Sequence, residues 1–205
     1  MTSMTCVRPI MWASVIAAIA LVGCRGTTPP VAFYTLHSPA TMKMESGAAG
    51  QEISIGVGPV AMPDFLDRPQ IVTRTSANRI SVSEFHRWAG SLPEDFLRVL
   101  AENLSILLAT NSVAAYPWEG RFDPTYRVLL DVKQFDGQLG EDVLLNVTWT
   151  VVAGTAKEEL LVQSSTIREP VSAPGYEALV SAQSEAIATL SREIVEAIRT
   201  LQARR

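Results

Sequence analysis

The chain has 205 residues, of which 47% are hydrophobic and 19% are charged, a composition typical of one globular domain and unlike that of disordered, collagen-like or polytopic membrane proteins. Its 17 Lys and Arg residues against 21 Asp and Glu residues give a formal net charge of -4, which argues against nucleic acid as a partner. The two histidines and two cysteines (His37, His86, Cys6 and Cys24) are too few and too scattered for a zinc cluster or a disulfide framework.

The N-terminus has the layout of a secretory signal peptide. Residues 1–8 contain one Arg and no acid, and residues 10–22 form a charge-free, mainly apolar stretch of 13 residues. As a helix this stretch would span about 20 Å, less than the roughly 30 Å of a bilayer core, so a permanent membrane span is disfavoured. We therefore expect residues 1–23 to be removed.

The residues that follow resemble a bacterial lipobox. In Leu21-Val22-Gly23-Cys24 a small residue precedes a cysteine, so Cys24 is the expected lipidation site, and its covalent lipid is the only prosthetic group expected. Residues 24–31 would form a tether that reaches at most about 25 Å. In lipoproteins an Asp after the cysteine commonly retains the protein in the inner membrane. Arg25 stands there instead, and this favours the periplasmic face of the outer membrane.

Residues 32–205 are predicted to form a single periplasmic domain that begins with short strands. A first strand is expected over 32–36, followed by a mobile connection over 37–51. Apolar residues then alternate from Ile53 to Val57, which indicates a strand that Pro59 ends. A hairpin is expected from strands over 71–74 and 79–82.

Two amphipathic helices are predicted. Ser91 to Glu94 form a capping box with a proline in the first turn, and the apolar stripe that follows extends to Leu108. Short and long strands are expected over 113–116, 126–135, 143–151 and 160–167, the last three as an antiparallel meander, with Trp149 in the core. Apolar residues at three- and four-residue spacing predict a final helix over 176–201, which could cover the sheet or meet a partner helix.

The predicted fold class is α+β, an α/β sandwich. Two helices and six or seven strands would form a mostly antiparallel or mixed sheet with both helices packed on one face.

Four common sequence motifs of catalytic sites do not occur in the chain. It contains no G-x-S-x-G, H-E-x-x-H, Walker A or C-x-x-C pattern. Gly56-Val57-Gly58 is read as a close-packed strand end in preference to a phosphate loop. His86 is read as an exposed or capping residue in preference to a general base. A tethered periplasmic hydrolase is therefore the weakest of the function classes considered, and the chain is predicted not to be an enzyme.

Trp88 and Trp118 are candidates for a contact surface. Both fall in irregular segments beside Pro or charged residues, where an aromatic ring can anchor an interface or can cover the edge of the core.

Several segments together resemble the ABC-type transport auxiliary lipoproteins, the PqiC/YmbA-like group associated with MCE lipid-transport systems. The resemblance covers nearly the whole mature chain, and its most specific piece is Leu66-Asp67-Arg68-Pro69-Gln70-Ile71-Val72. The other segments are the lipobox with residues 33–36, then 55–60, 63–65, 78–80, 85–88, 92–108, 116–118, 126–128 and 135–137.

This resemblance implies a non-catalytic outer-membrane lipoprotein that docks a periplasmic MCE protein and completes a conduit for phospholipid or another hydrophobic substrate. It is also compatible with a homo-oligomer around the conduit. An alternative is an assembly or export lipoprotein whose partner is an outer-membrane β-barrel. We expect the contact surface to comprise Leu66, Asp67, Arg68, Pro69 and Gln70 together with Trp88 and Trp118. The competing interpretation is that an ion pair of Asp67 with Arg68 only fixes the loop.

Overall fold

The structure is a computed structural model, which describes residues 29–40, 42–43, 53–118, 122–154 and 158–204. The predicted signal peptide, Cys24 and residues 25–28 of the tether lie outside the described residues. The chain divides into two compact units, Met1–Pro30 and Val31–Arg205, and all described helices and strands belong to the second.

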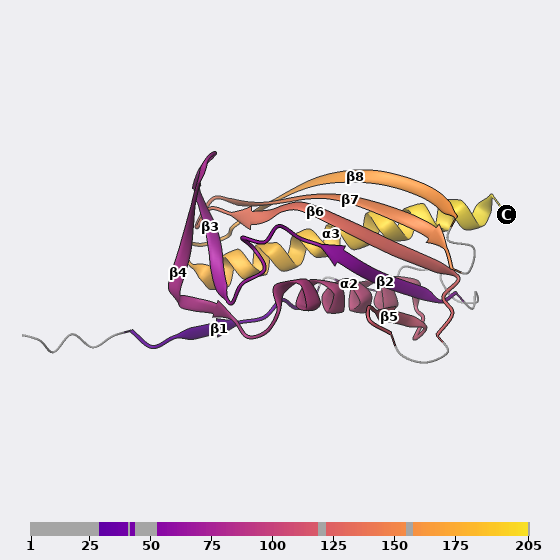
Figure 1. The fold of residues 1–205 in the computed structure, drawn as a ribbon, viewed down its shortest axis with the longest axis horizontal. Helices are drawn as coiled ribbons and strands as arrows, with labels where there is room; N and C mark the ends of the chain where they lie inside the picture. Colours follow the sequence, from indigo (N-terminus) through magenta and orange to yellow (C-terminus); the bar gives the residue numbers. More distant parts are fainter. Residues whose placement is uncertain (1–28, 41, 44–52, 119–121, 155–157, 205) are drawn as a thin grey trace, which may run out of the picture. The chain divides into compact units, whose positions relative to one another are not determined.

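The unit Val31–Arg205 contains eight strands and two helices in its described residues (Figure 1), against the six or seven strands predicted. Each of the eight overlaps a range predicted above, including the three-residue strands at 32–34 and 113–115, so only the predicted total is too low. In chain order the elements are β1 (Ala32–Tyr34), β2 (Ile55–Ala61), β3 (Gln70–Ser76), β4 (Arg79–Trp88), α2 (Leu92–Leu108), β5 (Val113–Ala115), β6 (Tyr126–Gly137), β7 (Asp142–Ala153), β8 (Glu159–Pro170) and α3 (Tyr176–Ala203).

The larger sheet has five strands in the order β5-β2-β6-β7-β8. The predicted antiparallel meander is confirmed for β6, β7 and β8, whereas β2 pairs in parallel with both β5 and β6. The expectation that Pro59 ends the second strand is wrong. The register of β2 against β6 shifts between Val57 and Val60, so Pro59, which has no N–H to donate, falls in the irregular part of the strand.

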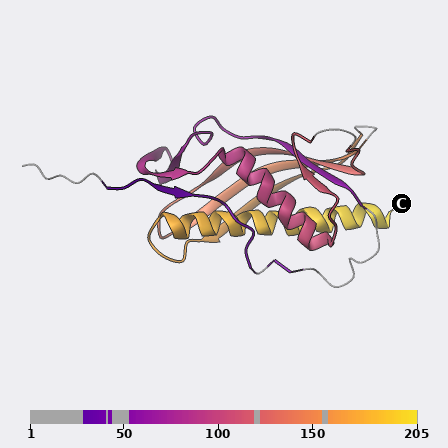
Figure 2. The same cartoon turned by 90° about the horizontal axis from the view of Figure 1, so that it is seen from below.

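Both helices cover the same face of this sheet and cross in front of its strands in Figure 2. The Ser91 Oγ accepts a hydrogen bond of 3.4 Å from the Glu94 N–H, so α2 begins at the predicted cap. The long helix α3 packs on β6, β7 and β8, and α2 packs on β2 and β5. Trp149 is fully buried between these layers, and the predicted α+β class with two helices on one face is confirmed.

The remaining strands form a separate three-stranded sheet in the order β1-β4-β3, where the sequence had suggested a single sheet. Strand β4 pairs with β1 in parallel and with β3 in antiparallel fashion. Its register against β3 shifts between Gln70 and Val72, where β4 has extra residues that bend the strand.

The segment after β1 is held in place where the sequence suggested a mobile connection. The side chain of Leu36 is fully buried, that of Met42 is 8% exposed, and both belong to the hydrophobic core. The backbone N–H of His37 donates to Ser184 Oγ in α3 at 3.3 Å. Two apolar side chains in a polar stretch are thus enough to fix residues 36–40 and 42–43 against the helices, although they are too few to show a periodic pattern. The rest of the predicted connection, residues 41 and 44–51, lies outside the described residues.

Candidate functional site

The loop between β2 and β3 carries most of the predicted contact residues. The Leu66 side chain is 2% exposed and anchors the loop in the core, whereas Asp67, Arg68 and Pro69 are exposed. Backbone hydrogen bonds to the Pro63 and Leu66 carbonyls hold the turn, from Leu66 N–H at 2.8 Å and from Arg68 N–H at 2.9 Å. The ion pairs found among the described residues do not involve Asp67 or Arg68. The predicted internal ion pair is therefore not what fixes this loop.

Trp88 lies at the end of β4 and belongs to the core. Its side chain is 5% exposed, so a partner protein cannot reach the ring without unpacking it. Its backbone N–H donates to the Pro69 carbonyl at 2.7 Å and so ties the 66–70 loop to β4. The two alternatives for Trp88 are an interface anchor and a ring that covers the edge of the core. Its position fits the second.

Trp118 follows β5 and packs on β2 of the larger sheet, within a group that we name the aromatic cluster: Tyr116, Trp118, Phe122 and Arg127. The Trp118 ring stands edge-on to Tyr116 at 5.5 Å and to Phe122 at 6.0 Å, and the Arg127 guanidinium lies 5.3 Å from its centre. A Cβ added to Gly56 would come within 2.9 Å of Trp118, which shows how closely the ring packs on β2. Tyr116 is 48% exposed, so the cluster presents an aromatic surface to solvent.

The structure does not bring the seven predicted contact residues into one surface. Strand β1 lies beside the start of α3, where the rings of Tyr34 and Tyr176 are 6.4 Å apart. The end of α2, which leads into β5 and the aromatic cluster, lies beside the end of α3, where Arg199 Nη2 donates to the Leu107 carbonyl at 3.4 Å. Figures 1 and 2 place β1 and β5 correspondingly apart. Between these two points α3 rises about 35 Å, so the loop bonded to Trp88 and the aromatic cluster are separate surfaces.

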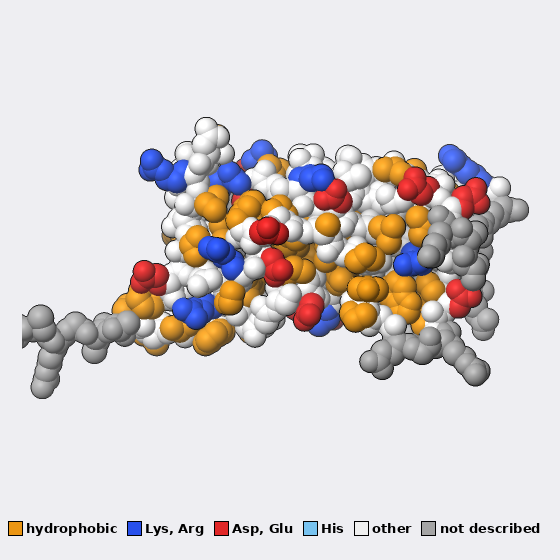
Figure 3. Space-filling view, in the orientation of Figure 1, with side chains coloured by type: hydrophobic (Ala, Val, Ile, Leu, Met, Phe, Trp, Pro, Cys, Tyr) orange, Lys and Arg blue, Asp and Glu red, His pale blue; other side chains and the backbone are white. Residues whose placement is uncertain are grey.

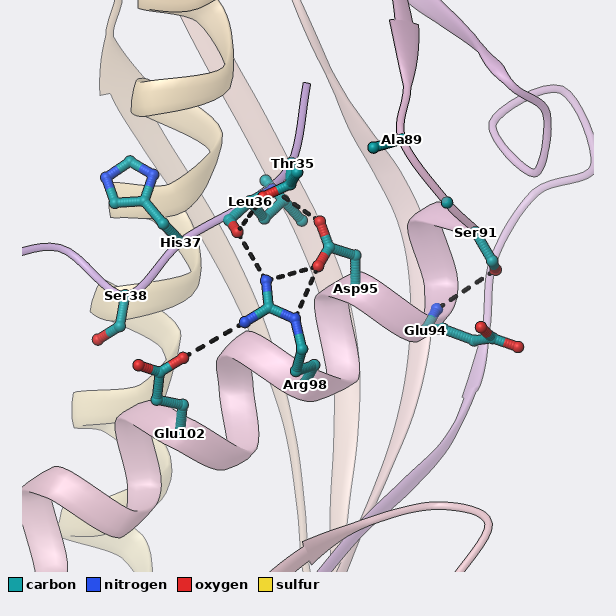
Figure 4. Close-up of a pocket in the computed structure, with 11 residues that line it drawn as sticks. Thr35, Leu36, His37, Ser38, Ala89, Ser91, Glu94, Asp95, Arg98 and Glu102 are labelled. Carbon is teal, nitrogen blue, oxygen red and sulfur yellow. Dashed lines mark hydrogen bonds and ion pairs between the residues drawn. The ribbon is translucent and has the colours of Figure 1, made fainter. Parts of the chain in front are cut away.

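Beside β1, two side chains of α2 hold both polar groups of the Leu36 backbone, its N–H and its carbonyl. Asp95 Oδ2 accepts from the Leu36 N–H at 2.7 Å, and Arg98 Nη2 donates to the Leu36 carbonyl at 2.7 Å. Arg98 also bonds Asp95 Oδ1 at 2.6 Å, so the two side chains orient each other, as Figure 4 shows. We refer to Asp95, Arg98 and Leu36 as the Leu36 clamp. It fixes the path of the chain immediately after β1.

An open groove of about 750 Å³ adjoins the Leu36 clamp. The side chains drawn in Figure 4 are mainly polar, and Glu94, Asp95, Arg98 and Glu102 supply four charges. An acyl chain in the groove would lie against these charges without satisfying them, so the groove does not have the character of a lipid-binding cavity.

The described histidines are engaged in packing. His86 stacks on Tyr176 with ring centres 3.9 Å apart, and a hydrogen bond of 2.7 Å joins its Nδ1 to the Tyr34 hydroxyl. Burial, with a smaller effect of the Glu177 carboxylate, raises the pKa of Tyr34. His37 Nδ1 lies 3.4 Å from Ser184 Oγ, but this serine is fully buried and donates to the Val180 carbonyl, so it is not placed as a nucleophile.

Two further properties of the described residues bear on other classes of protein. No group of three or more His, Cys, Asp or Glu side chains among them could hold a metal ion. No helix among them is both long enough and apolar enough to cross a bilayer.

Residues 34–195 match the family model of the ABC-type transport auxiliary lipoprotein component. The chain belongs to this family. It is 27% identical over 138 residues to the intermembrane transport lipoprotein PqiC of Escherichia coli strain K12, an alignment that covers 67% of this chain and 72% of PqiC, and it is equally similar to PqiC of Shigella flexneri. The predicted family resemblance is confirmed, and the protein is a distant homologue of PqiC.

Two solved structures share the fold. A crystal structure of a protein from Xanthomonas campestris superposes with a TM-score of 0.69 at 14% identity and covers 84% of this chain and 98% of the other. A second, of an uncharacterised protein, superposes with a TM-score of 0.67 at 21% identity and covers 83% and 99%. At these identities the likeness establishes the fold alone. The function established by family membership is that of an auxiliary lipoprotein of an ABC-type transport system.

Sequence reasoning missed the Leu36 clamp and the ion pair of Arg74 in β3 with Asp136 in β6, which joins the two sheets. Asp95 and Arg98 are spaced three residues apart on a helix, which predicts a pair with each other and not with a backbone segment 59 residues earlier. The one available signal for Asp136 is a carboxylate between Phe135 and Gly137 at the buried end of β6, where a charged group needs a partner.

Proposed function

We propose that the protein is an outer-membrane lipoprotein, anchored through a lipid on Cys24, that docks a periplasmic MCE protein and so assists the passage of lipid between the two membranes. Family membership and the distant homology to PqiC, an intermembrane transport lipoprotein, support the transport part of this proposal. The lipobox and Arg25 in the sequence support the anchor and its membrane.

The observation that carries the docking proposal is the separation of β1 from the aromatic cluster. The tether would join the domain at β1, because Val31 directly precedes this strand. Helix α3 rises about 35 Å between Tyr176, beside β1, and Arg199, beside the end of α2 that leads into the aromatic cluster. Exposed aromatic rings that are held rigidly by packing are typical anchors of protein interfaces. A domain bound to the membrane near β1 would present this cluster to a partner in the periplasm.

The test is a gentle-detergent pull-down of the full lipidated protein from separated outer membranes, with co-purifying proteins and lipids identified by mass spectrometry. The variants are Trp118→Ala and Tyr116→Ala in the aromatic cluster and Arg68→Ala in the 66–70 loop. Val162→Ala, on β8 and 56% exposed in the wild type, is the matched surface control. Unfolding curves of each variant separate a loss of binding from a loss of fold.

We expect the wild-type protein and Val162→Ala to recover an MCE-type protein. The cluster variants should recover severalfold less, because loss of an aromatic anchor costs about 2 kcal/mol of binding free energy. If Arg68→Ala alone lowers recovery, the docking surface is the 66–70 loop. Unchanged recovery with all three variants removes both surfaces, and a β-barrel as the recovered partner would instead support an assembly factor.

A further inference from the structure

We propose that the edge strand β1 lies against the bilayer surface, with the side chains of Phe33 and Val31 in the interfacial layer of the membrane. Among the described residues Phe33 is the most exposed large hydrophobic residue, at 64%, and Val31 is 43% exposed. Burial of a phenylalanine side chain is favourable by about 2 kcal/mol relative to leaving it in water. These two side chains therefore form an apolar surface that the rest of the domain leaves uncovered.

The fold holds this apolar surface in place. Strand β1 pairs in parallel with β4, where Phe33 stands opposite Arg87. The next residue, Tyr34, points the other way and packs against His86, and Leu36 is buried and held by its clamp. Because side chains alternate along a strand, the packing of Tyr34 fixes Phe33 outward.

The length of the preceding chain indicates what covers this surface. Val31 is the seventh residue after Cys24, and Phe33 is the ninth. Fully extended, these stretches of chain reach at most about 25 Å and about 32 Å. A lipid on Cys24 would therefore keep β1 within one tether length of the headgroups at all times. This inference rests on the lipid anchor of the proposed function.

The charges around β1 are mixed, which favours an apolar contact with the membrane over an electrostatic one. Arg87 stands opposite Phe33 on β4, and the acid Glu177 lines a pocket together with Phe33. In Figure 3, charged and hydrophobic side chains are interspersed at the end of the domain where Figure 1 places β1. Salt screens charge attraction and leave apolar burial intact. Contact through Phe33 should therefore persist at high salt.

The test places a fluorescent probe at position 33. The sequence has two cysteines, Cys6 in the predicted signal peptide and Cys24, whose sulfur the lipid would occupy. Phe33→Cys therefore adds the single free thiol of the mature lipoprotein, and Val162→Cys does the same on β8, at a wild-type residue of similar exposure. Each lipidated variant is labelled with an environment-sensitive dye and reconstituted into phosphatidylethanolamine and phosphatidylglycerol vesicles that contain a nitroxide-labelled lipid. Mass spectrometry of the N-terminal peptide reports acylation of Cys24.

We expect the dye at position 33 to shift to the blue and to lose at least severalfold more fluorescence to the nitroxide lipid than the dye at position 162, at low and high salt alike. Acylated protein with equal quenching at both positions overturns the inference and leaves the anchor intact. Protein without acyl chains overturns both. A blue shift that depends on protein density, without quenching by the nitroxide lipid, identifies a second copy of this chain on β1 and also overturns the inference.

Discussion

Arg74 in β3 and Asp136 in β6 form an ion pair that joins the two sheets. The Arg74 Nη2 and Nε atoms lie 2.7 Å and 3.0 Å from the two carboxylate oxygens, and Gln134 Nε2 donates a third hydrogen bond at 2.7 Å. The Asp136 side chain is completely buried, whereas that of Arg74 is 24% exposed. The hydrogen bond to Asp136 raises the pKa of Arg74. The pair thereby fixes the β3–β4 hairpin relative to the larger sheet.

Replacing Arg74 by Met should lower the free energy of unfolding by about 3 kcal/mol, because it leaves a buried carboxylate without its cation. The matched control is Arg168→Met, which breaks a pair with Asp142 in which the Arg168 side chain is 61% exposed. An exposed pair contributes less than about 1 kcal/mol. Urea denaturation of both variants measures the difference, and equal losses would show that Asp136 does not depend on Arg74.

Ser165 connects the buried ring of Trp149 to helix α3. Its Oγ accepts from the Trp149 indole N–H at 2.9 Å and donates to Glu193. Ser165→Ala should cost about 1–3 kcal/mol, because a buried indole N–H loses its acceptor, and should shift the Trp149 fluorescence. Ser164→Ala removes a neighbouring exposed hydroxyl that meets only Thr148 and should change stability by less than about 0.5 kcal/mol. Indistinguishable unfolding curves would argue against this hydrogen bond.

Gly58 adopts a positive φ of 108°, where an L side chain is strained. An added Cβ would also lie 2.9 Å from the Tyr116 Cβ and 3.1 Å from Leu97 Cδ1. Gly58→Ala should therefore lower the free energy of unfolding by about 1–3 kcal/mol and displace Tyr116. Gly90→Ala is the control, because a Cβ there meets nothing within 4 Å. Similar melting temperatures for the two variants would contradict the prediction.

The raised pKa of Tyr34 makes stability depend on alkaline pH. Burial is the larger cause and the Glu177 carboxylate the next, and both disfavour the phenolate in the folded state. The folded protein therefore binds this proton more tightly than the unfolded chain does. The resulting stability is fully present below the ordinary tyrosine value of 10.0 and is lost as the pH rises through the higher folded value.

Tyr34→Phe removes this proton, so the difference in unfolding free energy between wild type and variant should be constant below pH 10 and should decrease above it. Denaturant titrations of both proteins over that range give the difference. A constant difference on both sides of pH 10 would show that the Tyr34 phenol ionises equally well in the folded and unfolded states.

The sequence by itself determined the features that depend only on residues close together along the chain. The cap at Ser91, the stripe of α2, the seam of α3 and the meander of β6 to β8 are all local patterns, since helix and strand periods are visible within one element. The family was also recognisable, because the 66–72 run and the lipobox are each a short uninterrupted stretch of sequence. For the same reason the sequence identified Trp118 as unusual, although it did not give its neighbours.

Only the tertiary structure decided which distant segments meet. It separated Trp88 and the 66–70 loop from Trp118, because pairing of β4 with β1 and packing of Trp118 on β2 are long-range contacts that no local period encodes. It also placed Leu36 between Asp95 and Arg98, and Arg74 on Asp136. A polar side chain shows its type in the sequence, but its partner depends on where the whole chain folds it, since a buried charge takes whichever complementary group the packing brings within reach.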